Sequence, residues 1–262
     1  MLGPAAVSLA VTRVGDGPVS YVFLHGLLGQ GRNWSTIAKA LLPASSLLVD
    51  LPNHGRSPWT ADVSYEAMAG AVADLLTETQ TSPVTLVGHS MGGKVAMLVA
   101  LHHPALVARL AVVDISPADR NAMEFVRYLD AMLAIDLSRI ATRADADAQL
   151  SSAAPDPVVR AFLLQGLQRT DAGWEWRPNL EGLRHGIARI GGWPSVDGTY
   201  DGPVLWLAGE RSDYVTRDEL PAMRTLFPRV RLVVVKGAGH WVHADQPEVV
   251  AATLRQWASA TA

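Results

Sequence analysis

The stretch Thr85–Met97, TLVGHSMGGKVAM, is compatible with two different chemistries. Its first residues predict a buried strand, and those from Met91 onward predict a helix, with Gly88, His89 and Ser90 at the junction. As G-x-S-x-G, the stretch is a sharp strand-to-helix turn that exposes a serine hydroxyl as a nucleophile. As G-x-x-x-x-G-K, it is most of a phosphate-binding loop. The rest of the chain must decide between them.

Composition restricts the class of protein. Of the 262 residues, 49% are apolar and 18% are charged, a balance typical of a globular chain with a large core. The net charge is -3, and lysines and arginines form no run. We therefore expect neither nucleic acid nor a membrane surface as a partner.

Other features of the sequence bear on the compartment. The sequence contains no cysteine, which excludes a disulfide framework and a thiolate metal site and suits a reducing compartment. Residues 1–13, MLGPAAVSLAVTR, lack the charged start and the long apolar segment of a signal peptide. The longest apolar region, Val95–Ile115, is interrupted by two histidines, Pro104 and Arg109, which argues against a membrane span. We predict a soluble cytoplasmic protein.

Apolar strand-like runs alternate with segments of helical spacing along most of the chain. Strands are predicted at 19–24, 46–52, 84–87, 109–115, 203–209 and 231–237, and helices at 33–42, 65–77, 91–102, 217–226 and 246–257. Apolar strands without polar alternation, each followed by a helix, predict an α/β fold. Its sheet is expected to be mostly parallel, with helices on both faces.

Residues 119–199 interrupt this alternation. They contain helical stretches and the pair Pro155 and Pro157, but no convincing strand. Because the strand spacing resumes afterwards, we predict a single domain over residues 1–262, with a helical cap inserted at about 119–199.

The residue after the lysine decides the chemistry of the opening stretch. A phosphate-binding loop needs Ser or Thr there to hold Mg²⁺, and this chain has Val95. The serine alternative requires a histidine after a late strand, a carboxylate after an earlier one, and amide donors in an early loop. All three are present in that order, so we predict that Ser90 is the nucleophile.

The histidine is predicted to be His240, in the segment KGAGHWVHADQPE. Asp245 and Glu248 resemble a capping box, which would start the next helix just beyond His243 and leave His240 on a free loop. Because a serine hydroxyl is a poor nucleophile unless a base takes its proton, we assign His240 as the general base.

Two aspartates are candidates for the carboxylate that orients the imidazole. Asp213, in AGERSDYV, lies between a strand and a helix, the commonest place for the acid in such folds. Asp114, in VVDISP, ends the strand next to the one that precedes Ser90. Both strand ends face the same edge of the sheet, so topology leaves both open.

An oxyanion hole is the remaining requirement, because negative charge develops on the former carbonyl oxygen. The backbone N–H of Met91, directly after the nucleophile, is the first expected donor. The second is expected from the early loop FLHGLLGQ, at Leu27.

Six segments together resemble the α/β-hydrolase superfamily, in particular the small esterase subgroup of YbfF-type bacterial esterases and their mitochondrial relatives. They are HGLLG (25–29), DLPNHGRS (50–57), GHSMGGKVAM (88–97), VVDISP (112–117), WEWRPNL (174–180) and GAGHWVHADQP (237–247). The resemblance implies Asp114 as the acid, with Asp213 as the alternative. It also implies that WEWRPNL belongs to the cap, where Trp174 or Trp176 would face the acyl pocket. Trp241, beside His240, is expected to wall the site.

The residues therefore predict a serine carboxylesterase that cleaves small-molecule esters with short to medium acyl chains, or thioesters, through an acyl-enzyme. Neither a metal nor an organic cofactor is required, because the chain supplies every group. The alternatives are a carbon-carbon bond hydrolase or a lyase of menaquinone synthesis, which would bind anionic substrates through cap arginines, and a non-catalytic binding protein. The cap arginines considered are Arg127, Arg177, Arg184 and Arg189.

Overall fold

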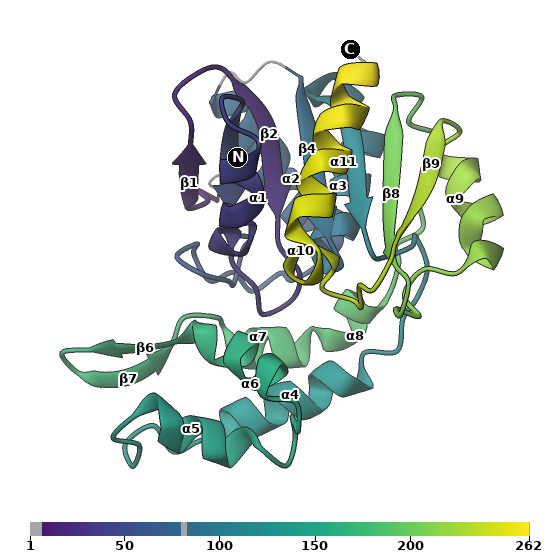
Figure 1. Ribbon diagram of the computed structural model, residues 1–262. Coiled ribbons are helices and arrows are strands. Elements are labelled where there is room, and N and C mark those ends of the chain that lie inside the picture. The colour runs from purple at the N-terminus through teal and green to yellow at the C-terminus, as the bar shows by residue number, and fades with distance from the viewer. Residues whose placement is uncertain (1–6, 80–82, 262) are drawn as a thin grey trace, which may run out of the picture.

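A seven-stranded sheet forms the centre of the computed structural model, which describes residues 7–79 and 83–261 (Figure 1). The strands lie in the order β1-β3-β2-β4-β5-β8-β9. Their bounds are β1 Val11–Val14, β2 Val19–Leu24, β3 Ser45–Val49, β4 Val84–His89, β5 Val107–Val113, β8 Val204–Gly209 and β9 Val230–Val235. Only β1 runs antiparallel to its neighbour, so the predicted mostly parallel sheet is confirmed.

Helices cover both faces of the sheet, as predicted for an α/β fold. One face carries α1 (Ser35–Ala40), α10 (Val242–Asp245) and α11 (Pro247–Ala260), which pack around the buried Trp34 and Trp257. The other carries α2 (Tyr65–Glu78), α3 (Met91–His102) and α9 (Leu220–Leu226). Short 3-10 turns are found at Gly31–Trp34, Pro104–Leu106, Leu164–Gly166 and Arg217–Glu219.

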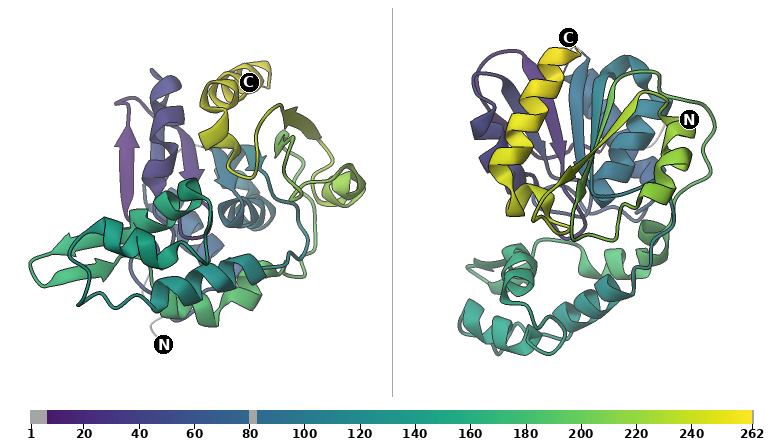
Figure 2. Two further views of the ribbon diagram at one scale, coloured as in Figure 1. Left: turned by 60° about the horizontal axis from the view of Figure 1, so that its bottom comes forward. Right: turned by 45° about the vertical axis from the view of Figure 1, so that its right-hand side comes forward.

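The chain between β5 and β8 forms a separate layer across the carboxyl end of the strands (Figures 1 and 2). We call residues 119–199 the cap segment. It contains α4 (Met123–Leu133), α5 (Arg143–Leu150), α6 (Pro157–Leu163), α7 (Leu180–His185) and α8 (Ile187–Gly191). It also contains a hairpin of β6 (Leu167–Thr170) and β7 (Gly173–Trp176).

The hairpin corrects the expectation that the cap segment has no strand. Each of its strands has only four residues, and they pair with each other apart from the main sheet. Gly173, with a φ of 122°, follows the two-residue turn in a backbone conformation that other residues rarely adopt. Such short strands leave too few alternating positions for a periodic signal in the sequence.

The parallel order brings several chain segments together at one edge of the sheet. Ser90 follows β4, Asp114 follows β5, and His240 lies on the loop after β9. Because parallel strands end on the same side, these three positions share the edge that the cap segment covers.

Among the described residues, no helix combines the length and apolar composition needed to cross a membrane. Residues 1–6 of the N-terminal stretch used above lie outside the described residues.

Candidate active site

Ser90 lies at a strained turn between β4 and α3. Its φ is 50° and its ψ is -121°, a conformation that non-glycine residues rarely adopt. The turn is tight because a Cβ on Gly88 would lie 2.1 Å from the carbonyl oxygen of Gly92. The Ser90 N–H donates to the carbonyl of Val113 at 3.0 Å, which fixes the turn against β5.

His240 bridges Ser90 and Asp114. The Ser90 hydroxyl lies 3.1 Å from Nε2 of His240, and Nδ1 lies 2.8 Å from Oδ2 of Asp114. The carboxylate accepts the Nδ1 hydrogen, so Nε2 is left as the acceptor for the serine hydroxyl. The imidazole is stacked on the Tyr214 ring at 3.9 Å between centroids, which restricts its rotation.

The loop of His240 is fixed by one long-range and one local hydrogen bond. Nε2 of His89 donates to the carbonyl oxygen of His240 at 2.9 Å, and the Gly239 N–H donates to Asp245 at 2.7 Å. The expected capping box at Asp245 is therefore incorrect, because this carboxylate faces back toward Gly239 rather than capping the next helix. The chain forms the short α10 first, and α11 begins at Pro247. His240 is nevertheless on a loop, as predicted.

Asp114, not Asp213, contacts the imidazole. Asp114 is fully buried, with a φ of 53°, and its Oδ1 accepts the Gly209 N–H at 2.8 Å. Its Oδ2 accepts both the His240 hydrogen and the Ser212 hydroxyl. Asp213 is exposed on the same loop as Ser212. The loop after β8 therefore contributes a hydroxyl to this group of residues rather than its carboxylate.

The two expected oxyanion donors lie at the serine. Leu27 and Met91 line the same cavity as Ser90, and within the described chain no acceptor occupies the backbone N–H of either residue. The early loop approaches closely because position 26 is glycine. A Cβ there would lie 2.8 Å from Nδ1 of His89 and 3.3 Å from the Cβ of Ser90.

Four buried histidines surround these residues and are held neutral. Burial lowers the pKa of His25 to about 4 and the pKa values of His54 and His243 to about 3. Burial, followed by the neighbouring His243, lowers the pKa of His89 well below its ordinary value. These side chains support the backbone: for example, the Leu51 N–H donates to Nε2 of His25 at 3.0 Å.

The cavity beside Ser90 is small, at about 40 Å³. Its apolar wall combines residues of the sheet edge with residues of the cap segment, namely Leu27, Met91, Ile115, Phe125, Ile187 and Ile190. A second small cavity, on the His240 side, is lined by Phe125, Phe162 and Trp241. The structure thus places Trp241 at the site.

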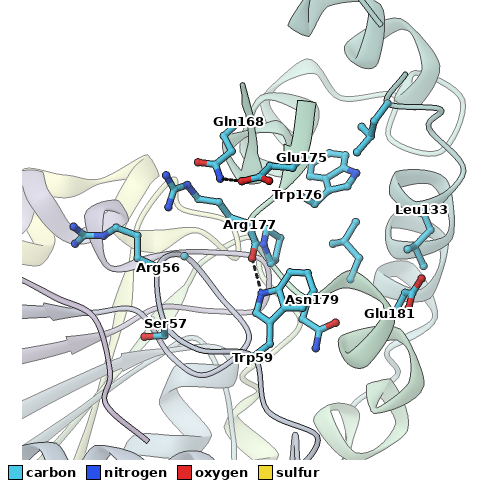
Figure 3. Close-up of a pocket in the computed structure, with 14 residues that line it drawn as sticks. Arg56, Ser57, Trp59, Leu133, Gln168, Glu175, Trp176, Arg177, Asn179 and Glu181 are labelled. Carbon is cyan, nitrogen blue, oxygen red and sulfur yellow. Dashed lines mark hydrogen bonds between the residues drawn. The ribbon is translucent and has the colours of Figure 1, made fainter. Parts of the chain in front are cut away.

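Trp174 and Trp176 do not reach Ser90, contrary to the expectation that one of them faces the acyl pocket. Both lie on β7, and the hairpin carries them to a different part of the cap segment. Trp176 lines an open groove of about 630 Å³ next to Trp59 and Arg177 (Figure 3). Trp174 lies beneath the guanidinium groups of Arg143 and Arg169.

Several residues of the site were missed in the sequence. They are Ser212, Tyr214, Phe125, Phe162 and Lys94. A signal was available for the first two, because SDY lies in the loop after an apolar strand of the sheet, where site residues gather. The cap residues carry no such signal, since their approach to Ser90 depends on how the cap segment packs.

A serine on a strained strand-to-helix turn, with a histidine and a carboxylate beside it on one edge of a parallel sheet, is an arrangement typical of hydrolases. A family model described as the alpha/beta hydrolase fold matches residues 22–247. The chain therefore belongs to the alpha/beta hydrolase fold family.

Relatives and solved structures agree with this assignment. The chain is 40% identical to the sn-1-specific diacylglycerol lipase ABHD11 of Danio rerio over 86% of this chain and 74% of that protein. It is 32% identical to the esterase YbfF of Escherichia coli over 90% of this chain and 91% of that protein. A marine microorganism esterase superposes with a TM-score of 0.93 at 34% identity, covering 96% of this chain and 99% of that one. These similarities support a hydrolase of the esterase and lipase type.

Proposed function

We propose that this protein is a serine carboxylesterase that uses Ser90, His240 and Asp114. The observation that carries the proposal is the continuous hydrogen-bonded chain from the Ser90 hydroxyl through both nitrogens of His240 to Asp114, at 3.1 and 2.8 Å. Each group has the place that its role needs: the nucleophile on the turn, the base beside it, and the acid buried behind the base.

In the first step, Oγ of Ser90 attacks the ester carbonyl carbon and its proton passes to Nε2 of His240. The N–H groups of Leu27 and Met91 receive the oxygen that becomes negative in the tetrahedral intermediate. Donors already fixed in this way are worth several kcal/mol in such reactions. Asp114 stabilises the imidazolium without taking its proton.

The intermediate collapses when the bond to the leaving alkoxide breaks and Nε2 gives its proton to the departing oxygen. An acyl-Ser90 remains. Water then gives a proton to Nε2 and attacks the acyl carbon, and the acid leaves as Oγ recovers its proton. Every proton and electron pair in this cycle is handled by the chain and water, so the proposal needs no cofactor. A thioester could enter the same cycle with a thiolate as the leaving group.

The size of the cavity supports the short end of the proposed acyl range. Its volume of about 40 Å³ and its wall of leucine, isoleucine and phenylalanine side chains suit a small apolar group. Longer chains would require the cap segment to move. We accordingly propose that the cap segment is an insertion within a single hydrolase domain and that it sets the acyl preference.

The arginines considered for anionic substrates lie elsewhere. Arg184 pairs with Asp130, Arg189 with Asp62, and Arg177 faces the groove of Figure 3. The guanidinium of Arg127 lies over the ring of Tyr128. Arg120 does line the Ser90 cavity, but Glu219 neutralises it. The remaining cation of this cavity, Lys94, donates to the backbone carbonyls of Gly191 and Gly192. These pairings favour a neutral ester over the anionic substrates of the carbon-carbon hydrolases and lyases.

The names of the relatives also support an ester bond as the target. The fish relative is named for a diacylglycerol and the bacterial one as an esterase. We therefore propose that this chain also acts on a carboxylic ester, the substrate class that both names indicate.

The test is turnover of p-nitrophenyl esters of graded acyl length, with Ser90→Ala as the control. We expect a burst of p-nitrophenol followed by steady turnover, best with short to medium acyl groups, and neither with Ser90→Ala. Absence of both burst and turnover in the wild type across the series would refute the proposal.

A further inference from the structure

Lys94 is a buried cation one helical turn after Ser90. It lies in α3, and only 1% of its surface is exposed. A buried ammonium group is costly unless it is hydrogen-bonded. Its partners therefore indicate what the residue does.

Those partners belong to the end of the cap segment. Nζ of Lys94 donates to the carbonyl of Gly192 at 2.6 Å and to that of Gly191 at 3.2 Å, at the end of α8. The ring of Tyr65 lies 5.5 Å from Nζ. The Tyr65 hydroxyl donates to the carbonyl of Ile190 at 2.6 Å. Two side chains from α2 and α3 thus hold three consecutive carbonyls.

The two connections of the cap segment meet at this place. The N–H of Arg120, where the chain enters the cap, donates to the carbonyl of Gly191 at 2.7 Å. The N–H of Trp193, where the chain leaves it, donates to Asp119 at 2.7 Å. Lys94 therefore binds the point at which entry and exit meet.

This point is also a wall of the proposed acyl pocket. Tyr65, Lys94, Ile190 and Gly191 line the cavity beside Ser90. If the end of α8 moved away from α3, the cavity would lengthen in that direction.

We propose that Lys94 is a positioning residue that holds both connections of the cap segment against α3 and so limits the acyl chain accepted at Ser90. The inference rests on the proposed esterase function and adds what sets its acyl preference. Loss of the ammonium removes the donor to the Gly192 carbonyl and one of the two donors to the Gly191 carbonyl, and the cavity wall becomes free to shift.

Titration of Lys94 supplies a readout that packing alone would not. Burial lowers the pKa of Lys94 to about 8; Asp119 raises it and Arg120 lowers it. Among the described residues, Tyr65 also packs its ring against Nζ, and burial raises the pKa of its hydroxyl. Hydrogen bonds from a charged donor are stronger than those from a neutral amine. The bonds from Lys94 to the carbonyls of Gly191 and Gly192 therefore weaken above about pH 8.

The experiment compares kcat/KM for p-nitrophenyl butanoate and decanoate in the wild type, in Lys94→Met and in Lys39→Met. Lys39 is an exposed lysine on α1, so its variant is the matched control. We expect the butanoate-to-decanoate ratio to fall about tenfold in Lys94→Met, mainly through a lower KM for decanoate. Lys39→Met should keep the wild-type ratio.

The pH dependence of the same ratio is the second measurement. Any effect of pH on the chemical steps that the two esters share changes both rates alike and cancels in the ratio. The wild-type ratio should fall between pH 7 and pH 9, whereas that of Lys94→Met should stay constant. A folded Lys94→Met variant with the wild-type ratio and pH dependence would overturn the inference.

Tyr65→Phe decides the matter if Lys94→Met does not fold. It removes only the hydroxyl bonded to Ile190, so a fall in the ratio of about threefold is expected, corresponding to one neutral hydrogen bond. An unchanged ratio would overturn the inference. Failure of the esterase proposal looks different, because the wild type would then turn over neither ester.

Discussion

The sheet edge and the cap segment contribute different kinds of groups to the same site. The edge supplies buried polar groups held by strained backbone, at Ser90 and Asp114. The cap segment supplies mostly apolar surface, including Phe125, Phe162 and Ile190. If the proposed function holds, the sheet edge provides the chemistry, and the packing of the cap segment sets the acyl preference. Substitutions at the edge should therefore change rates greatly, and those in the cap should change selectivity modestly.

The largest effect is expected at the two aspartates. Asp114→Asn should lower kcat/KM for ester hydrolysis about ten-thousandfold, because the amide cannot stabilise the imidazolium and favours the wrong tautomer. Asp213→Asn should stay within about threefold, since its side chain is exposed and the imidazole already has a partner. The measurement is kcat/KM for ester hydrolysis by both purified variants and the wild type. An equal loss in the two would refute the choice of acid.

Gly26→Ala should have the next largest effect. The added methyl group would press on His89 and Ser90, which displaces the loop that carries the Leu27 N–H. Loss of one oxyanion donor is worth on the order of a hundredfold in kcat. The KM for a short ester should change less than kcat. A kcat equal to that of the wild type would show that this loop does not hold the oxyanion.

Acid should unfold the protein through its buried histidines. Above the ordinary histidine pKa, near 6.5, both folded and unfolded states carry neutral rings. As the pH falls below it, only the unfolded state gains protons, because the folded pKa values are about 4 for His25 and about 3 for His54 and His243. Each such ring should cost about 2 kcal/mol of unfolding free energy at pH 5.

Urea unfolding at pH 7 and pH 5 measures this loss. His54→Asn, whose amide can still donate toward the Pro52 carbonyl, should lose about 2 kcal/mol less than the wild type between the two pH values. His102→Gln is the control, because His102 is exposed. Equal pH dependence of all three proteins would mean that His54 is not held neutral.

The smallest effect is expected at the tryptophans. Trp241→Phe should change the relative kcat/KM among esters of different size by a few fold, because the ring walls the cavity beside His240. Trp176→Phe should leave that relative rate unchanged, since its ring lines the groove of Figure 3 instead. A panel of esters tests both variants. A larger change from Trp176→Phe would place the substrate along that groove.

Local signals were sufficient to predict the sheet edge. The apolar runs of the parallel strands and the pattern around Ser90 predicted the fold, and the order of the elements predicted that His240 lies near the serine. The choice between Asp114 and Asp213 was beyond spacing alone, because both follow strands that end at the same edge. The positive φ of Asp114 and the donors from Gly209 and Ser212 distinguish them, and these are properties of the folded chain.

The cap segment was predicted only in outline. The sequence predicted its helical character and its place between two strands. It did not predict the hairpin at 167–176, because the strands of the hairpin are too short for a periodic pattern. The prediction that Trp174 or Trp176 faces the acyl pocket was wrong for the same reason, because both residues lie on this hairpin. Which cap residues approach Ser90 depends on distant contacts such as Lys94 with Gly192, and sequence spacing does not encode these.

The most direct test of the central claim is labelling with a fluorophosphonate, followed by mass mapping of the modified peptide. Attack by an activated serine forms a stable phosphonyl adduct and expels fluoride. We predict a single adduct on Ser90, formed much more slowly in His240→Gln and Asp114→Asn. No adduct on the folded wild type, an adduct on another residue, or labelling at an equal rate in the His240 variant would contradict the account.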